Sequence, residues 1–119
     1  MAKITVIDDS KATIDMLAAI LRSGNHEVTA YLESSNVEIN IASEQPDLIL
    51  LDIVMPERNG FEVLRALRRD SSTRNIPVIL VSSKNQPTDI LWGKRQGAND
   101  YITKPFTPES ILSAIGQFL

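Results

Sequence analysis

The chain has 119 residues, with 23% charged side chains, a net charge of −3 and no cysteine. Its acidic balance argues against broad nucleic-acid binding, which requires a basic surface, and the missing cysteines exclude disulfides and thiol chemistry. No apolar run approaches the ~20 residues that cross a bilayer, and no basic-then-apolar leader is present. We therefore expect one cytoplasmic domain, residues 1–119, that contacts neither nucleic acid nor membrane directly.

Strand and helix patterns alternate in chain order. Strands are expected at residues 4–8, 27–31, 48–51, 78–81 and 100–102. Helices are expected from an N-cap at Ser10 to Gly24, from Ser34 or Ser35 through Ala42, over residues 61–69 and 88–96, and from Thr107 or Pro108 to Leu119. Five βα units with right-handed crossovers predict an α/β fold, a doubly wound five-stranded parallel sheet in a three-layer α/β/α sandwich. Periodicity leaves the strand order open, with a Rossmann-like order as the alternative.

Charged residues end three of the expected strands. Asp8 and Asp9 end the first, Asp52 the third and Lys104 the fifth. Because the carboxyl ends of parallel strands meet at the edge where open α/β sheets bind ligands, we expect these four side chains to gather there. Three carboxylates and one ammonium contribute little to folding, but they suit a divalent cation and a phosphoryl group.

The pair Asp8 and Asp9 matches the preference of Mg²⁺ for oxygen ligands, commonly one or two carboxylates together with a substrate phosphate. The alternative is that the two residues cap the first helix and interact with its dipole. A third carboxylate across the sheet, that of Asp52, favours the metal-binding interpretation.

Asp52 follows four apolar residues, and an isolated carboxylate at the end of a buried strand is costly unless something pairs with it. A carboxylate in this position can attack phosphorus and form an acyl phosphate. Lys104 can neutralise phosphate oxygens, and Pro105 permits a cis peptide that would turn the lysine back over the sheet edge. The alternatives are that Asp52 caps the turn that begins there and that Lys104 is a solvated surface residue.

Weaker signals come from the last two strands and the helix between them. Ser82 ends the fourth strand, where its hydroxyl can donate to a phosphate oxygen or simply belong to a turn. Tyr101 lies in the fifth strand, either as a core residue or as one that rotates between inward and outward rotamers. One of Ile90, Leu91 and Trp92 must face solvent, which can mark a partner surface, although core packing is the commoner fate of each.

The stretches VIDDS, LLDIVMPERNGFEVL, VILVSSK and GANDYITKPF together resemble the receiver domain of two-component response regulators, the CheY-like superfamily. The likeness runs from the first strand to the last helix and implies a flavodoxin-like strand order of 2-1-3-4-5. It also implies that the phosphodonor is the phosphohistidine of a histidine kinase. The segment DILWGKRQGANDY is similar to single-domain receivers of pilus-type chemosensory systems, which act in motility.

The resemblance implies specific roles at the metal site. Asp52 is the expected phosphoacceptor, and Asp8, Asp9 and Asp52 are expected to bind Mg²⁺ together with the main-chain carbonyl of Val54. Val54 and Lys84 occupy positions that tune the lifetime of the phosphoryl group in this family.

The resemblance also implies a switch. Ser82 takes the position of the switch serine or threonine, Lys104 that of the phosphate-binding lysine and Tyr101 that of the aromatic switch residue. Phosphorylation would move Ser82 and Lys104 toward the phosphate, and Tyr101 would fill the vacated space. The face made by the fourth helix, the fifth strand and the fifth helix would then change its affinity for a downstream target protein.

Three other classes of function remain as alternatives. A Mg²⁺-dependent phosphohydrolase of the dehalogenase type would use the same aspartyl chemistry, but it wants an Asp two residues after the nucleophile, where this chain has Val54. A flavodoxin-like domain would bind flavin phosphate after the first strand, where DDSKAT places two negative charges instead. A constitutive interaction module would keep the site without switching.

We expect a phosphoacceptor switch that catalyses its own phosphorylation and dephosphorylation, without turnover of a small-molecule substrate.

Overall fold

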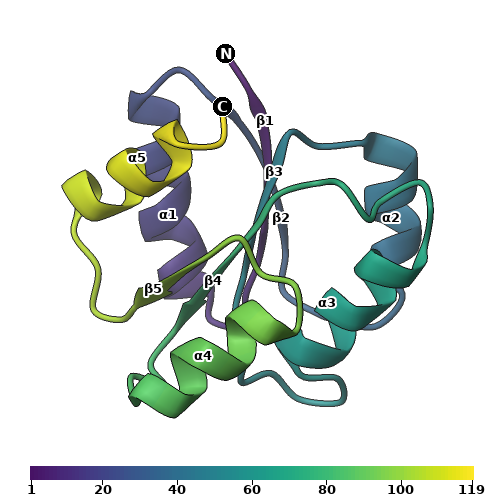
Figure 1. Ribbon diagram of the computed structural model, residues 1–119. Helices are drawn as coiled ribbons and strands as arrows, with labels where there is room; N and C mark the ends of the chain where they lie inside the picture. Colours follow the sequence, from purple (N-terminus) through teal and green to yellow (C-terminus); the bar gives the residue numbers. More distant parts are fainter.

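A computed structural model describes residues 1–119, in which five parallel strands form one sheet with helices on both faces (Figure 1). The strands are β1 (Lys3–Ile7), β2 (Glu27–Tyr31), β3 (Leu48–Leu51), β4 (Val78–Ser82) and β5 (Asp100–Thr103). The helices are α1 (Lys11–Ser23), α2 (Val37–Glu44), α3 (Gly60–Arg69), α4 (Pro87–Arg95) and α5 (Pro108–Gly116).

The strand order is β2-β1-β3-β4-β5. This is the order that the family resemblance implied, and the Rossmann-like alternative is wrong. Every residue of β3 and β4 is buried because helices cover both faces, which explains why these strands are continuous apolar runs. The outermost strand, β2, is mostly exposed or half-buried, as expected of an edge.

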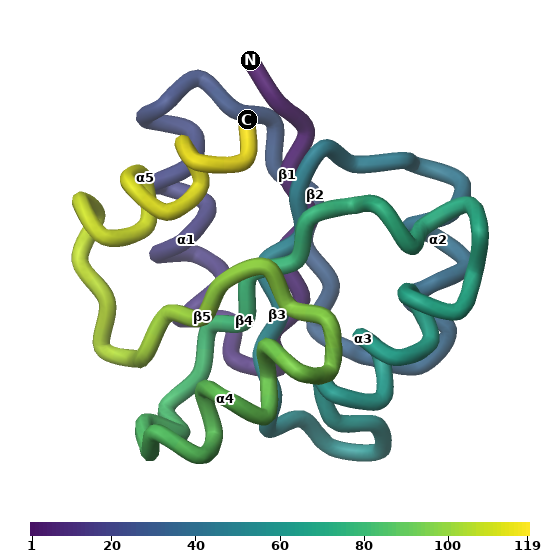
Figure 2. Tube along the Cα trace, in the orientation of Figure 1, coloured from purple at the N-terminus to yellow at the C-terminus, as the bar shows by residue number.

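Two separate hydrophobic cores lie on the two faces of the sheet. Figures 1 and 2 show α1 and α5 together on one face and α2 and α3 on the other, and α4 covers this second face beside β5. The first core gathers apolar side chains of α1 and α5, among them Leu17, Leu21 and Ile111. The second gathers those of α2 and α3, among them Ile41, Leu64 and Leu67. No helix combines the length and the apolar character needed to span a membrane.

The predicted N-cap of the first helix and the predicted start of the last helix, at Thr107 or Pro108, are confirmed. The Ser10 hydroxyl accepts a hydrogen bond from the Thr13 amide (3.3 Å). Thr107 forms a capping box with Ser110 ahead of α5, which ends at Gly116 instead of Leu119.

The prediction for the start of the second helix is wrong. The helix α2 begins at Val37, after Asn36 in the left-handed region (φ 58°), and no side chain caps it. Ser34 is 2% exposed and its hydroxyl donates to the carbonyl of Arg58, so it is unavailable to a helix terminus. Local composition favours serine as a cap, but this tertiary contact outweighs it.

The helix α4 packs through its backbone. Its only buried residue is Gly93, whose missing side chain leaves room for Leu80 and Tyr101. Leu91 and Trp92 are about half exposed (52% and 50%). At least one apolar residue of this helix was expected to face solvent, which is confirmed, but core packing is the wrong expectation for these two.

Arg68, at the end of α3, ties three segments of the second face together. Its guanidinium donates hydrogen bonds to the carbonyls of Arg74 (3.0 Å), Ile76 (2.8 Å) and Gly97 (3.0 Å) and to the side-chain oxygen of Asn99 (3.0 Å). Burial lowers the pKa of Arg68, and the four acceptors offset that loss of hydration. The network fixes the loop between α4 and β5 to the rest of the fold.

Arg68→Met is therefore expected to lower the free energy of unfolding by about 2–3 kcal/mol, because it leaves several backbone carbonyls without their charged donor. Urea denaturation measures the change. The matched control is Arg69→Met at the adjacent exposed residue, with an expected effect within about 0.5 kcal/mol. Equal losses in the two variants would show that the network contributes nothing to stability.

Candidate functional site

The register of the sheet places two aspartates on adjacent strands at one edge. Ile7 of β1 pairs with Leu51 of β3, so Asp8 and Asp52 are the residues that directly follow these two strands. The Asp52 amide donates to the Ile7 carbonyl (2.9 Å), which continues the ladder by one bond. Both aspartates are buried, with exposed fractions of 1% for Asp8 and 6% for Asp52.

A third aspartate completes an acidic cluster. Asp8, Asp9 and Asp52, which lies 43 residues further along the sequence, each place one carboxylate oxygen within 4.8 Å of the other two. Asp8 also accepts a hydrogen bond from the Ser10 amide (2.9 Å), but the side-chain cap of α1 is the Ser10 hydroxyl, bound to Thr13. The alternative that Asp8 and Asp9 cap the first helix is therefore wrong.

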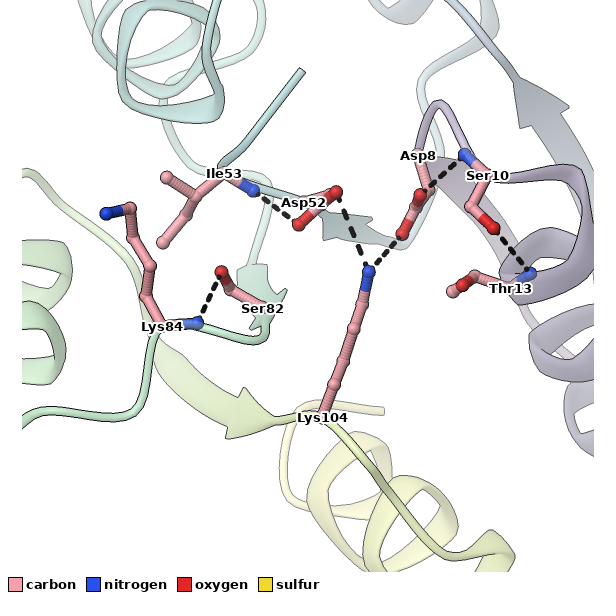
Figure 3. A network of polar contacts seen from close by, with 8 residues as sticks. All are labelled: Asp8, Ser10, Thr13, Asp52, Ile53, Ser82, Lys84 and Lys104. Atoms are coloured by element: carbon pink, nitrogen blue, oxygen red, sulfur yellow. Dashed lines mark hydrogen bonds and ion pairs between the residues drawn. The ribbon is translucent and has the colours of Figure 1, made fainter.

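Lys104 lies between two of these carboxylates (Figure 3). Its ammonium is 2.8 Å from the Asp8 Oδ2 atom and 3.6 Å from the Asp52 Oδ2 atom. The Lys104 amide donates to the Ser82 carbonyl (2.8 Å), and the Lys104–Pro105 peptide is cis. The lysine side chain is only 21% exposed, so it is an ion-pair partner and not a freely solvated surface residue.

Asp52 is held in a carboxylate-rich, poorly hydrated position. Burial, with the nearby charge of Asp8 as the next cause, raises the pKa of Asp52 from 3.8 to about 6, although Lys104 and the Ile53 amide act in the opposite direction. The Ile53 amide donates to Asp52 Oδ1 (2.8 Å) and leaves the second oxygen facing Lys104. The ionised carboxylate is thus only partly compensated by the protein itself.

The donor set fits Mg²⁺. All three side chains offer carboxylate oxygens, the hard ligands that this cation prefers, and they converge on one small volume. The site contains three carboxylates but only one ammonium, that of Lys104. The remaining negative charge can be balanced by a divalent cation.

Ser82 and Tyr101 both bind the main chain of Lys84. The Ser82 hydroxyl, fully buried, accepts from the Lys84 amide (3.2 Å), and the Tyr101 hydroxyl donates to the Lys84 carbonyl (2.6 Å). Burial is the main reason that the pKa of Tyr101 is raised. The structure thus links Ser82 to Tyr101 through one residue of the β4–α4 loop, while neither makes a hydrogen bond with the acidic cluster. Val54 is 54% exposed in the loop after Asp52.

Gly60 is a residue of the site that the sequence interpretation missed, since the third helix was expected to begin one residue later, at residue 61. It is the first residue of α3, its amide donates to the Ile53 carbonyl (2.8 Å), and a Cβ there would overlap the Asp52 carbonyl oxygen. The Asn59-Gly60 pair after a strand is the only sequence signal for it. Glycine is required at this position because α3 lies directly against the backbone of Asp52.

Comparisons with known proteins agree with the fold. A family model described as the response regulator receiver domain matches residues 4–116. Protein PilH of Pseudomonas aeruginosa is 45% identical over 122 residues, which cover 100% of this chain and 98% of PilH. The DNA-binding dual master transcriptional regulator RpaA of Synechocystis is 35% identical over 119 residues, and this chain spans 49% of its length. The chemotaxis protein CheY4 of Vibrio cholerae is similar in structure, with a TM-score of 0.92, 28% identity and coverage of 100% of this chain and 99% of that one.

Gly60→Ala is expected to lower the free energy of unfolding by about 3 kcal/mol or more, because the added methyl group collides with backbone that cannot move without displacing Asp52. Gly116→Ala is the control, since a Cβ there meets nothing within 4 Å. It should be neutral or stabilising by up to about 1 kcal/mol. Thermal and urea unfolding of both variants check this, and similar stabilities would contradict the close approach.

Asp52→Asn is expected to stabilise the metal-free protein at about pH 7 by about 1–3 kcal/mol, because each unit of raised pKa costs ~1.4 kcal/mol once the carboxyl is ionised. Between the unfolded pKa of 3.8 and the folded value of about 6, the folded state binds more protons. The cost therefore grows as the pH rises through this window and disappears below it. Urea titrations across this range, with exposed Asp15→Asn as control, should show the advantage of Asp52→Asn vanishing toward about pH 4. An advantage independent of pH would contradict the assignment.

Proposed function

Because the chain belongs to the response regulator receiver domain family, we propose that it accepts a phosphoryl group on Asp52 from a histidine kinase and then presents an altered surface to a downstream protein. Receiver domains are signalling switches and not classical enzymes. The observation that carries the proposal is the convergence of three carboxylates and Lys104 at the carboxyl edge of the sheet.

The phosphoacceptor role rests on the position of Asp52. Its Oδ1 atom is engaged by the Ile53 amide, which orients the carboxylate and leaves Oδ2 toward Lys104. In the proposed reaction Oδ2 attacks phosphorus, the bond from phosphorus to the donor's histidine nitrogen breaks, and that nitrogen leaves with the bonding electrons. Lys104 is near enough to neutralise a phosphoryl oxygen on Asp52.

Asp8, Asp9 and Asp52 would hold Mg²⁺, with the main-chain carbonyl of Val54 as a further ligand. Bound Mg²⁺ supplies charge neutralisation between the anionic carboxylate and the anionic phosphodonor. The Lys104 ammonium now pairs with Asp8. On phosphorylation it would leave Asp8 and pair with a phosphoryl oxygen on Asp52.

The switch is proposed to run through Lys84. Phosphorylation adds about −1.5 to −2 charges beside Ser82, whose hydroxyl would leave the Lys84 amide to donate to a phosphoryl oxygen. Tyr101 holds the carbonyl of the same residue, so movement of this loop would change its position against α4. Full switching requires about 5.5 kcal/mol of differential stabilisation, a scale that a few charge-assisted hydrogen bonds and a metal bridge can supply.

The output surface is proposed to be the face of α4, β5 and α5. Its support is the pair Leu91 and Trp92, apolar side chains that stay about half exposed on α4. The similarity to PilH across the whole length of this chain supports a place in a pilus-type chemosensory system.

Incubation with Mg²⁺ and acetyl phosphate tests the proposal. The wild type is expected to gain a single phosphoryl group sensitive to hydroxylamine, as an acyl phosphate is, whereas Asp52→Asn gains none. Intact-protein mass spectrometry measures both, with Asp15→Asn as a control that should still be labelled. Labelling of Asp52→Asn, or no labelling of the wild type, would contradict the assignment.

Three further outcomes would support the alternatives. Steady release of phosphate from several monoesters would indicate a phosphohydrolase. A yellow purified protein would indicate a flavin-binding domain. Equal affinity for a target with and without beryllofluoride, which mimics a phosphoryl group, would indicate a constitutive interaction module.

A further inference from the structure

The loop that leaves Asp52 contains a strained turn. Glu57 has φ +69°, in the left-handed region, and the Arg58 amide donates to the Pro56 carbonyl (2.8 Å). A hydrogen bond that closes over one left-handed residue is a γ-turn of the rare, strained kind. A non-glycine residue in this conformation costs about 1–3 kcal/mol and persists only where its surroundings hold it.

Ser34 and Glu38, from the segment around the start of α2, hold this turn. The Ser34 hydroxyl donates to the Arg58 carbonyl (2.8 Å), and a longer contact reaches the Pro56 carbonyl (3.5 Å). In return, the Arg58 guanidinium donates to the Ser34 carbonyl (3.1 Å) and to Glu38 Oε1 (2.7 Å). We call Ser34, Glu38 and Arg58 the loop clamp.

The clamp is mostly shielded from water, which strengthens its hydrogen bonds. Ser34 is 2% exposed, and the side chains of Arg58 and Glu38 are 25% and 29% exposed. Burial alone would raise the pKa of Glu38, yet the hydrogen bond from Arg58 makes the net shift a lowering. The lowered pKa is consistent with the ion pair of 2.7 Å between these two partly buried side chains.

The clamp and Asp52 hold the same loop from opposite ends. At the near end, Ile53 is fixed by two hydrogen bonds, from its amide to Asp52 and from the Gly60 amide to its carbonyl. At the far end, Pro56 and Arg58 are fixed by the clamp. Val54, whose carbonyl is the proposed metal ligand, lies between these two anchors. Without the far anchor, the loop would have to be ordered when the cation binds, and that entropy loss would weaken binding.

We propose that the Ser34–Glu38–Arg58 clamp is a positioning device, which holds the loop between Asp52 and Gly60 so that the main-chain carbonyl of Val54 is ready to bind a divalent cation. This inference rests on the proposed function, since it assigns a regulator of affinity to the same acidic site. It predicts that the clamp sets the affinity for Mg²⁺ in the unphosphorylated protein.

A Mg²⁺ titration of the unphosphorylated protein, followed by amide NMR shifts, tests the inference. Arg58→Met should raise the Kd roughly three- to tenfold, less than the ~10–100-fold typical of direct outer-shell partners, because Arg58 acts through the main chain. Ser34→Ala should act in the same direction, and Arg58→Lys, which retains a cationic donor for Glu38, should recover part of the affinity. Amide hydrogen exchange at positions 57–60 should be faster in Arg58→Met even without Mg²⁺.

Arg68→Met is the matched control, because it removes an arginine network from the opposite end of α3 and should lower stability without changing the Kd for Mg²⁺. An unchanged Kd in both Arg58→Met and Ser34→Ala would overturn the inference and leave the clamp as a stabilising contact only. A raised Kd without acetyl phosphate labelling of Asp52 would support the clamp while the proposed function fails. A wild type that binds no Mg²⁺ would overturn both.

Discussion

Two buried carboxylates, those of Asp8 and Asp52, share one ammonium, that of Lys104, and the properties of the site follow from this incomplete compensation. Burying a charge without a partner is costly, and one lysine cannot balance three acids. Under the proposed function, the protein holds its acidic site in a state that a bound divalent cation would stabilise. The raised pKa of Asp52 expresses the same imbalance, because burial and the charge of Asp8 disfavour its ionised form. If the proposed function holds, stability is given up at this site for the ability to bind a cation and a phosphoryl group.

The sheet supplies the geometry for this arrangement. Register on β1 and β3 puts Asp8 beside Asp52, and Lys104 reaches them from β5, on the far side of β4, with its long flexible side chain. Gly60 lets α3 contact the Asp52 backbone, and the clamp around Arg58 fixes the loop in between. The acidic site is thus positioned by backbone contacts on both sides of Asp52. With the loop already ordered, a cation would not have to order it on binding.

Much of this was predictable because the relevant signals are local. Apolar runs that stop at Asp8 and Asp52 mark the ends of buried parallel strands, and parallel strands place those ends at one edge. The start of α2 was not predictable, because Ser34 has the composition of a helix cap but binds Arg58, 24 residues away. Such a contact depends on where two loops meet in space, and no periodicity encodes it. The same holds for the choice of Asp8 as the nearer partner of Lys104.

A crystal structure with Mg²⁺ and beryllofluoride bound tests the shared-ammonium model of the site most directly. The predicted result is beryllofluoride on an Asp52 carboxylate oxygen, the cation among the three aspartates, and the Lys104 ammonium moved from Asp8, where it now lies at 2.8 Å, to a fluorine atom. Beryllofluoride bound elsewhere, or Lys104 still paired with Asp8 beside an unmodified Asp52, would contradict it.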